Sequence, residues 1–149
     1  MRAALMLLAL LALAGPVAAD MTPAPPRSRV PPAPSADQEY ARGLAAVRAK
    51  EWSVAEAAFT RAVQMRPAHP EAWNGLGYAL RNQGRYPESL RAYDEALRLR
   101  PDYPEALEYL GEAYVKLGRL DDARRVLDRL KRLDPAMAAE LAEVIAKGK

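Results

Sequence analysis

The stretch PEAWNGLGYALRNQGRYPESLRAYDEALRLRPDY, residues 70–103, determines the fold of this chain. Its first half places apolar residues at the i, i+3, i+4 and i+7 spacing of one helical face. Gly84 interrupts this pattern, and Pro87 follows where a first helical turn tolerates a missing N–H. The same spacing then resumes until Pro101 stops it. The stretch therefore predicts two helices joined by a short turn.

The pattern of this stretch recurs on both sides at an interval of 34 residues. Aligned columns of this kind are Gly43, Gly77 and Gly111; Ala55, Ser89 and Ala123; Phe59, Tyr93 and Leu127; and Pro67, Pro101 and Pro135. Several columns in one register define repeating units at 36–69, 70–103 and 104–137. No period-2 run bounded by turns occurs, so the sequence predicts an all-α chain without a sheet.

These columns resemble the tetratricopeptide repeat, with its pattern W-x2-L-G-x2-Y, then A-x3-F, then P. The middle unit supplies Trp73, Leu76, Gly77, Ser89, Tyr93, Ala96 and Pro101. The resemblance implies an α-solenoid of three helix–turn–helix repeats. In the first unit, Glu39 and Arg42 replace large apolar residues. We expect this change to keep the outer face of the first helix soluble, because no repeat precedes it.

The repeated glycines need a compensating gain, since each costs about 1 kcal/mol relative to alanine inside a helix. We expect the gain to be close approach of the partner helix at the small residues of the 55, 89 and 123 column. Residues 136–147, AMAAELAEVIAK, follow with an amphipathic pattern and predict a seventh helix that caps the last repeat. The alternative is that its apolar stripe binds a second chain.

The first nineteen residues, MRAALMLLALLALAGPVAA, have the layout of a secretory signal peptide: one basic residue, an apolar run and small residues before a cleavage site. The sequence therefore predicts an exported protein, periplasmic in a bacterial host. An uncleaved segment would instead anchor the chain in the inner membrane, facing the periplasm. Residues 20–35 contain six prolines among sixteen residues and predict a disordered linker, or alternatively a ligand for a proline-recognising domain.

Composition excludes most catalytic chemistry. The chain of 149 residues has no Cys and one His, which removes thiolate metal sites, a cysteine nucleophile and His-rich metal sites. No motif for a nucleophile elbow, phosphate loop or zinc protease occurs. His69 is expected to be a solvated turn residue, and Glu105, Glu108 and Glu112 a solvated helical face. We therefore predict no enzyme activity, no cofactor and no metal.

What remains is a surface, and the resemblance implies that the first helices of successive repeats line a concave peptide-binding groove. The family's groove positions are occupied here by Tyr40, Leu44, Arg48, Glu71, Asn74, Tyr78, Arg81, Asn82, Glu105, Glu108, Tyr109 and Glu112, together with Asp37, Val47, Val115 and Lys116. These positions hold five acids and three bases, a net charge of −2 in a protein of formal net charge +3.

The resemblance also implies which ligands the groove disfavours. The family's carboxylate clamp holds a terminal acid through Lys, Asn and Arg, but the clamp positions here are Tyr40, Leu44, Gly75, Glu105 and Tyr109. A partner ending in EEVD is therefore not expected, and the prediction is a protein or peptide segment that is neutral or basic.

The basic residues of 124–132 alternate with acids, which favours a solvent-exposed face over nucleic-acid binding. Together these features predict an exported adaptor or assembly factor that acts by protein–protein interaction. The alternative is a homo-oligomeric scaffold built by end-to-end stacking of repeats.

Overall fold

The computed structural model describes residues 33–148, so the expected signal peptide and most of the proline-rich linker lie outside the described residues. The described part contains seven helices and no strand: α1 (Ala36–Arg48), α2 (Trp52–Met65), α3 (Pro70–Asn82), α4 (Tyr86–Leu99), α5 (Pro104–Lys116), α6 (Leu120–Leu133) and α7 (Pro135–Lys147). The prediction of an all-α solenoid with three helix–turn–helix repeats and a capping helix is confirmed.

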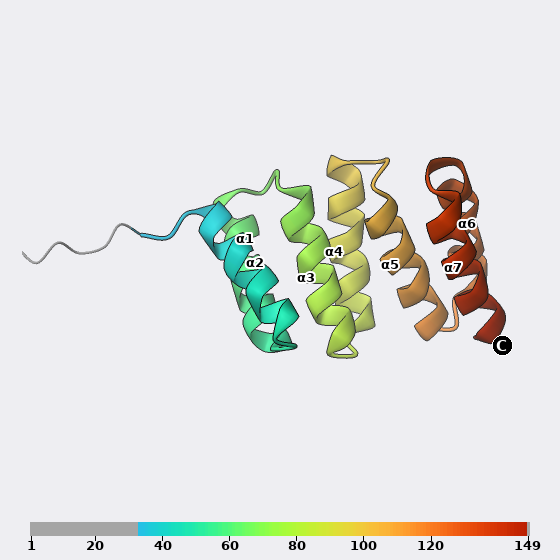
Figure 1. Ribbon diagram of the computed structural model, residues 1–149, viewed down its shortest axis with the longest axis horizontal. Coiled ribbons are helices and arrows are strands. Elements are labelled where there is room, and N and C mark those ends of the chain that lie inside the picture. The colour runs from blue at the N-terminus through green and yellow to red at the C-terminus, as the bar shows by residue number, and fades with distance from the viewer. Residues whose placement is uncertain (1–32, 149) are drawn as a thin grey trace, which may run out of the picture. The chain divides into compact units, whose positions relative to one another are not determined.

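Each repeat is a pair of helices that pack against each other and then against the next pair (Figure 1). The chain reverses direction within each repeat at Lys50, Gly84 and Gly118, which share one repeat position and have φ values of 58°, 76° and 70°. This left-handed conformation is natural for glycine and costs Lys50 about 1 kcal/mol or more.

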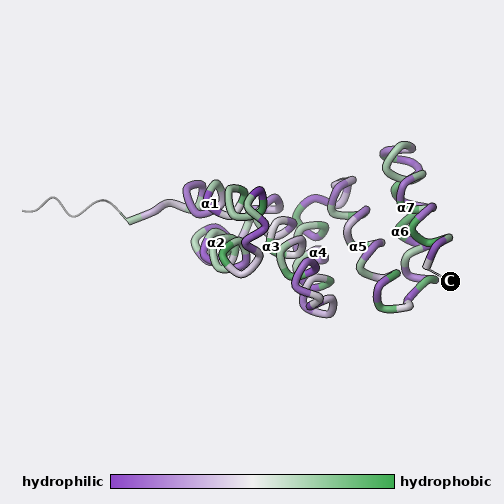
Figure 2. Tube along the Cα trace, turned by 60° about the horizontal axis from the view of Figure 1, so that its bottom comes forward, coloured by the Kyte–Doolittle hydropathy of each residue, from purple (hydrophilic) through white to green (hydrophobic). Residues whose placement is uncertain are grey.

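The helices are amphipathic, so hydrophilic and hydrophobic residues alternate along the tube of each one (Figure 2). The buried residues form two clusters, one in α1 to α4 and one from α4 to α7. Trp73 packs against both clusters, and its Nε1 donates a hydrogen bond to the carbonyl oxygen of Pro67 at 2.8 Å. This tryptophan therefore joins the first and second repeats to the third.

The atoms nearest to the repeated glycines belong to large side chains, and not to the small residues of the 55, 89 and 123 column that were expected. A Cβ on Gly43 would lie 2.5 Å from the Phe59 ring, and one on Gly77 would lie 2.6 Å from the Tyr93 ring. On Gly111 the nearest atom would be the Cδ2 of Leu141, at 2.5 Å. Each of these glycines thus lies against one bulky side chain, which for Gly43 and Gly77 comes from the facing helix of the same repeat.

The seventh helix covers the exposed end of the third repeat. It contacts α5 and α6, and it buries Ala138, Leu141 and Ile145. Leu141 is fully buried, at 0% exposure, over Gly111. Burying a leucine side chain contributes about 1.5–3 kcal/mol, so this contact accounts for a large part of the attachment of α7.

Glu39 lies inside the first repeat, which corrects the expectation that it keeps an outer face soluble. It is 5% exposed, and its Oε2 accepts a hydrogen bond from the Nε of Arg61 on α2 at 2.9 Å. A carboxylate is tolerated at an apolar repeat position because this arginine neutralises it. Arg42 lies on the exposed side of the same helix.

Across residues 33–148, none of the helices combines the length and the apolar character that spanning a membrane requires.

Candidate peptide-binding groove

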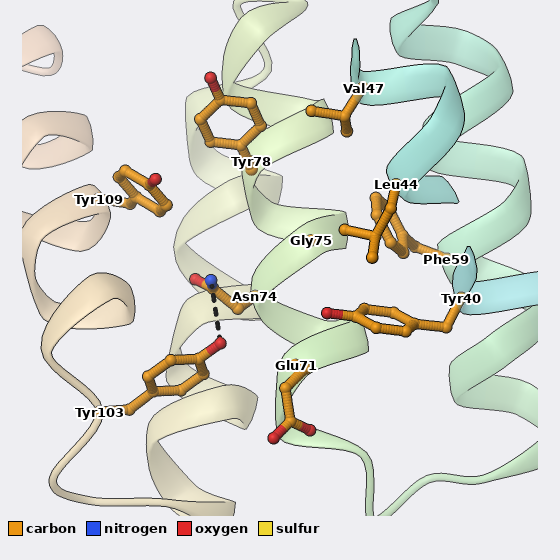
Figure 3. A pocket seen from close by; sticks show the side chains of 10 residues that line it. All are labelled: Tyr40, Leu44, Val47, Phe59, Glu71, Asn74, Gly75, Tyr78, Tyr103 and Tyr109. Atoms are coloured by element: carbon orange, nitrogen blue, oxygen red, sulfur yellow. Dashed lines mark hydrogen bonds between the residues drawn. The ribbon is translucent and has the colours of Figure 1, made fainter. Parts of the chain in front are cut away.

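A pocket of about 260 Å³ opens over α3, between α1 and α5 (Figure 3). One wall comes from α1, where Tyr40, Leu44 and Val47 occupy successive turns. Tyr78 projects from α3 and Tyr109 from α5, on the opposite side. The α1 side is therefore largely apolar, whereas the α3 and α5 side carries tyrosines and polar groups.

Half of the twelve principal residues predicted for the groove line this pocket: Tyr40, Leu44, Glu71, Asn74, Tyr78 and Tyr109. Arg81 and Asn82 line a neighbouring hollow with Tyr86 and Lys116. The remaining four, Arg48, Glu105, Glu108 and Glu112, line neither cavity. The structure thus divides the predicted surface into a tyrosine-rich pocket and a polar hollow beside it.

Three further pocket residues do not belong to the predicted groove positions. Phe59 comes from α2. A Cβ on Gly75 would lie only 2.6 Å from the Phe59 ring, so the absence of a side chain at Gly75 lets this ring reach the pocket. Tyr103 is the residue before α5, and its hydroxyl accepts a hydrogen bond from the Nδ2 of Asn74 at 3.4 Å. Tyr103 occupies the same repeat position as His69, so the 34-residue interval was the sequence feature that could have identified Tyr103 as a pocket residue.

Ion pairs alter the charge that was expected for the groove. Asp37 pairs with Arg66, and Glu71 pairs with Arg100, which is the equivalent pair one repeat later. Both arginines follow the second helix of their repeat, outside the positions that were counted. They balance two of the five acids that were counted, so the unbalanced negative charge of the groove is confined to the acids that lack such a partner.

The Glu71 carboxylate is held in its charged form by these contacts. Partial burial raises its pKa, but hydrogen bonds from Arg100 and His69 outweigh this effect and lower the pKa below its usual value. Glu71 is therefore an ion at neutral pH and an acceptor at the rim of the pocket.

Arg81 ties the second repeat to the third across the groove. It pairs with Glu112 on α5, and its guanidinium carbon lies 5.2 Å from the ring centroid of Tyr78 and 5.1 Å from that of Tyr109. Guanidinium groups at such distances are attracted by the electron-rich ring faces. The two tyrosines of the pocket are thus positioned by a cation from α3.

The acids nearest α7 have no such partner. Glu105 and Glu108 form no ion pair within residues 33–148, although Glu108 is only 9% exposed. Burial raises the pKa of Glu108, and the nearby carboxylate of Glu140 on α7 raises it further. The expectation of three solvated glutamates was therefore wrong, because Glu108 is buried and Glu112 is paired. Unbalanced negative charge remains at the α5 end of the groove.

His69 is also not the solvated turn residue that was expected. It is 8% exposed, its Nδ1 lies 3.0 Å from the Oε2 of Glu71, and its ring centroid lies 4.8 Å from that of Tyr40. The histidine is the residue before α3, and it is enclosed by the first helices of two successive repeats. It therefore contacts two residues that line the pocket, Glu71 and Tyr40.

No group of three or more His, Asp or Glu side chains that could hold a metal ion occurs in the described part of the chain.

Comparison with known proteins agrees with this architecture. Among solved structures, the Arabidopsis OM64 TPR domain is 18% identical, with a TM-score of 0.73 over 77% of this chain and 97% of that one. The first TPR of Spaghetti (RPAP3), bound to the HSP90 peptide SRMEEVD, is 19% identical, with a TM-score of 0.70 over 74% and 90% of the two chains. PcrH in complex with the chaperone binding region of PopD is 22% identical, with a TM-score of 0.69 over 75% and 89%.

At these identities the solved structures show the fold alone. No curated protein sequence matches the chain. The sequence model of the tetratricopeptide repeat matches residues 40–104 and 78–138, which together are more than half of the chain. The protein belongs to the tetratricopeptide repeat family.

Proposed function

We propose that this protein is an exported interaction module, an adaptor or assembly factor, that binds a segment of a partner protein in the groove formed by α1, α3 and α5. The observation that carries the proposal is the pocket over α3, where four tyrosines converge on the groove face of the repeats: Tyr40, Tyr78, Tyr103 and Tyr109. Tyrosines offer broad contact area and a hydrogen-bonding tip at a low entropic cost. Similar folds accompany peptide ligands in the Spaghetti and PcrH structures.

The segment bound here is proposed to be neutral or basic. The positions that resemble the carboxylate clamp hold Tyr40, Leu44, Gly75, Glu105 and Tyr109, and four of these five line the pocket. None of them is a cation, so a terminal carboxylate would meet aromatic and apolar groups and the charge of Glu105. Burying an anion without a partner is costly. An acidic C-terminus of the kind bound to Spaghetti is therefore disfavoured.

The proposed site of action is outside the cytoplasm. This part of the proposal rests on the sequence of residues 1–19, which has the basic start, apolar run and small-residue end of a signal peptide. Fractionation of cells that express the full chain tests it. Mature protein in the periplasm supports cleavage and export, membrane association of the unprocessed chain supports anchoring, and cytoplasmic protein contradicts the proposal.

Site-specific photocrosslinking tests the binding surface. A photoreactive residue is placed at Leu44, which is a 36% exposed apolar residue on the pocket wall. The matched control is Val54 on α2, which is 38% exposed and outside the pocket. We expect a discrete crosslinked partner from position 44 and not from position 54. Equal crosslinking from both positions, or none from either, would contradict the groove as the binding site.

A further inference from the structure

The tyrosine pocket has the chemistry of a receptor for one arginine side chain. Its volume of about 260 Å³ is below the range of about 300–1,000 Å³ that holds a drug-sized ligand, so it suits a single side chain of a longer segment. Leu44, Val47 and Phe59 form an apolar wall, and Asn74 and Glu71 form a polar one. The matching ligand has an apolar stem and a polar end that donates hydrogen bonds.

The polar wall offers acceptors. The Oδ1 of Asn74 is buried and has no hydrogen-bond partner within the described residues, while its Nδ2 is directed to the hydroxyl of Tyr103 (Figure 3). A buried acceptor without a donor costs about 1–3 kcal/mol, and a ligand N–H that reaches it removes this cost. Glu71 adds a carboxylate at the same rim.

The tyrosine rings have the geometry for a guanidinium, because the chain's own arginines already stack on three of them. Arg81 lies over Tyr78 and Tyr109, and the guanidinium carbon of Arg100 lies 4.7 Å from the ring centroid of Tyr103. Each of these arginines is paired with an acid, Glu112 or Glu71, so neither leaves an excess of positive charge.

The excess charge around the pocket is negative. Burial raises the pKa of Tyr103 to about 12, and the charges of Glu105 and Glu71 contribute to this rise. Burial and Tyr78 raise the pKa of Tyr109, with a further contribution from Glu108. The carboxylates that contribute to these rises, Glu71, Glu105 and Glu108, would also attract a cation. The bases of the groove that form no ion pair within residues 33–148, Arg48 and Lys116, do not line this pocket.

From these contacts we propose that the pocket binds an arginine side chain of the partner, with its stem against Leu44 and Phe59 and its guanidinium between Asn74 and the tyrosine rings. This inference rests on the proposed peptide-binding function and names the residue that anchors the segment. Arginine is favoured over lysine because a planar guanidinium stacks on aromatic rings and donates at fixed angles to several acceptors.

A library of displayed random linear peptides is first selected for binding to the full chain, which identifies a binding sequence. Synthetic versions then differ only at the anchor position, which carries arginine, lysine, norleucine or glutamate. We expect the arginine peptide to bind at least tenfold more tightly than the norleucine peptide, with lysine between them and glutamate weakest. The preference for arginine over norleucine should shrink as salt rises, because the pocket is open to solvent.

A matched pair of variants locates the anchor in the pocket. Leu44 is exposed enough that Leu44→Glu and Leu44→Lys keep the core intact, and they place opposite charges on the pocket wall. We expect the arginine peptide to bind about tenfold more tightly to the first variant than to the second, and the norleucine peptide to differ by less than threefold. The same substitutions at Val54 should change neither affinity.

Two results overturn the inference in distinguishable ways. The selected peptides could bind through a leucine or tryptophan anchor, with an affinity that depends on Leu44. This result refutes the arginine anchor and leaves the groove proposal standing. The absence of any peptide whose binding responds to substitution at Leu44 refutes both the arginine and the groove.

Discussion

The terminal helices of the repeat domain begin differently from the helices between them. The side chain of Ser35 caps α1 in a capping box with Gln38, and the carboxylate of Asp134 caps α7 by accepting the backbone N–H groups of Ala136 and Met137, each at 3.0 Å. The helices α2 to α6 have no side-chain cap. Interior helices are held by a neighbour on each side, whereas an end helix lacks one of them, and its cap adds about 1 kcal/mol.

The connection into α7 shows how the array ends. Four residues, 66–69 and 100–103, separate the first and second repeats from the helix that follows, but only Asp134 separates α6 from α7. The proline of the 67, 101 and 135 column lies in the loop twice and is the first residue of α7 the third time. One sequence position therefore has two structural roles.

A second proline explains this difference. Pro70 and Pro104 follow three residues after the column proline, whereas Ala138 stands at the third place. Proline disfavours a helical conformation in the residue before it. His69 and Tyr103 are accordingly extended, with ψ of 86° and 94°, and the next helix starts only at the second proline. Without it, α7 begins three residues early and packs on α5 and α6.

The early start of α7 also alters the groove. In the first two repeats, an arginine at the 66 and 100 positions pairs with an acid of the preceding first helix. The third repeat has Asp134 at this position, where it caps α7. Glu105, the acid equivalent to Asp37 and Glu71, forms no ion pair among residues 33–148. Because an aspartate stands where the other repeats have an arginine, the α5 side of the groove keeps an unbalanced negative charge.

Placing a proline at position 138, as in the other two repeats at 70 and 104, tests this comparison and should have the largest effect on stability. Ala138→Pro removes the hydrogen bond from the N–H of residue 138 to the carbonyl oxygen of Asp134, now 3.0 Å long, and moves Met137 out of the helical conformation. We expect a loss of about 3 kcal/mol or more in the free energy of unfolding, measured by urea denaturation. Ala138→Gly keeps the N–H and should cost about 1 kcal/mol. Equal losses for the two variants would contradict a role for the proline.

Removing the cap of α7 should have a smaller effect. Asp134→Ala eliminates the acceptor of two backbone N–H groups and should lower the free energy of unfolding by about 0.5–2 kcal/mol. Asp134→Asn keeps an acceptor at the same place, so its free energy of unfolding should lie within a few tenths of a kcal/mol of the wild-type value. If the Asn variant is as unstable as the Ala variant, the cap is not what Asp134 contributes.

The repeat columns were sufficient to predict the helices, because each column repeats the same burial requirement three times. The columns also carried the information for the early start of α7, since Ala138 stands at the repeat position that Pro70 and Pro104 occupy in the other repeats. The groove was only half predictable. Its family positions are all in first helices, whereas Arg66 and Arg100 reach the groove from the ends of second helices. These pairs join residues 29 positions apart within one repeat, so they depend on how its two helices pack, which no local pattern records.

The smallest expected effect concerns the negative end of the groove. Burial and Glu140 raise the pKa of Glu108, so folding favours its protonated form. The stability that this carboxyl contributes is complete below its unfolded pKa of about 4.3 and is lost as the pH rises through the folded value. Glu108→Gln, which cannot ionise, should therefore be more stable than the wild type at pH 7 by about 0.5 kcal/mol.

The gain should disappear when thermal melting is repeated at about pH 4 or below, because the wild-type carboxyl is then protonated as well. Glu143→Gln removes the same charge from the exposed side of α7, where Glu143 pairs with Lys147 at 3.2 Å, and should give no gain at either pH. A gain of equal size from both variants would mean that lower net negative charge, rather than the buried position of Glu108 beside Glu140, stabilises this end of the domain.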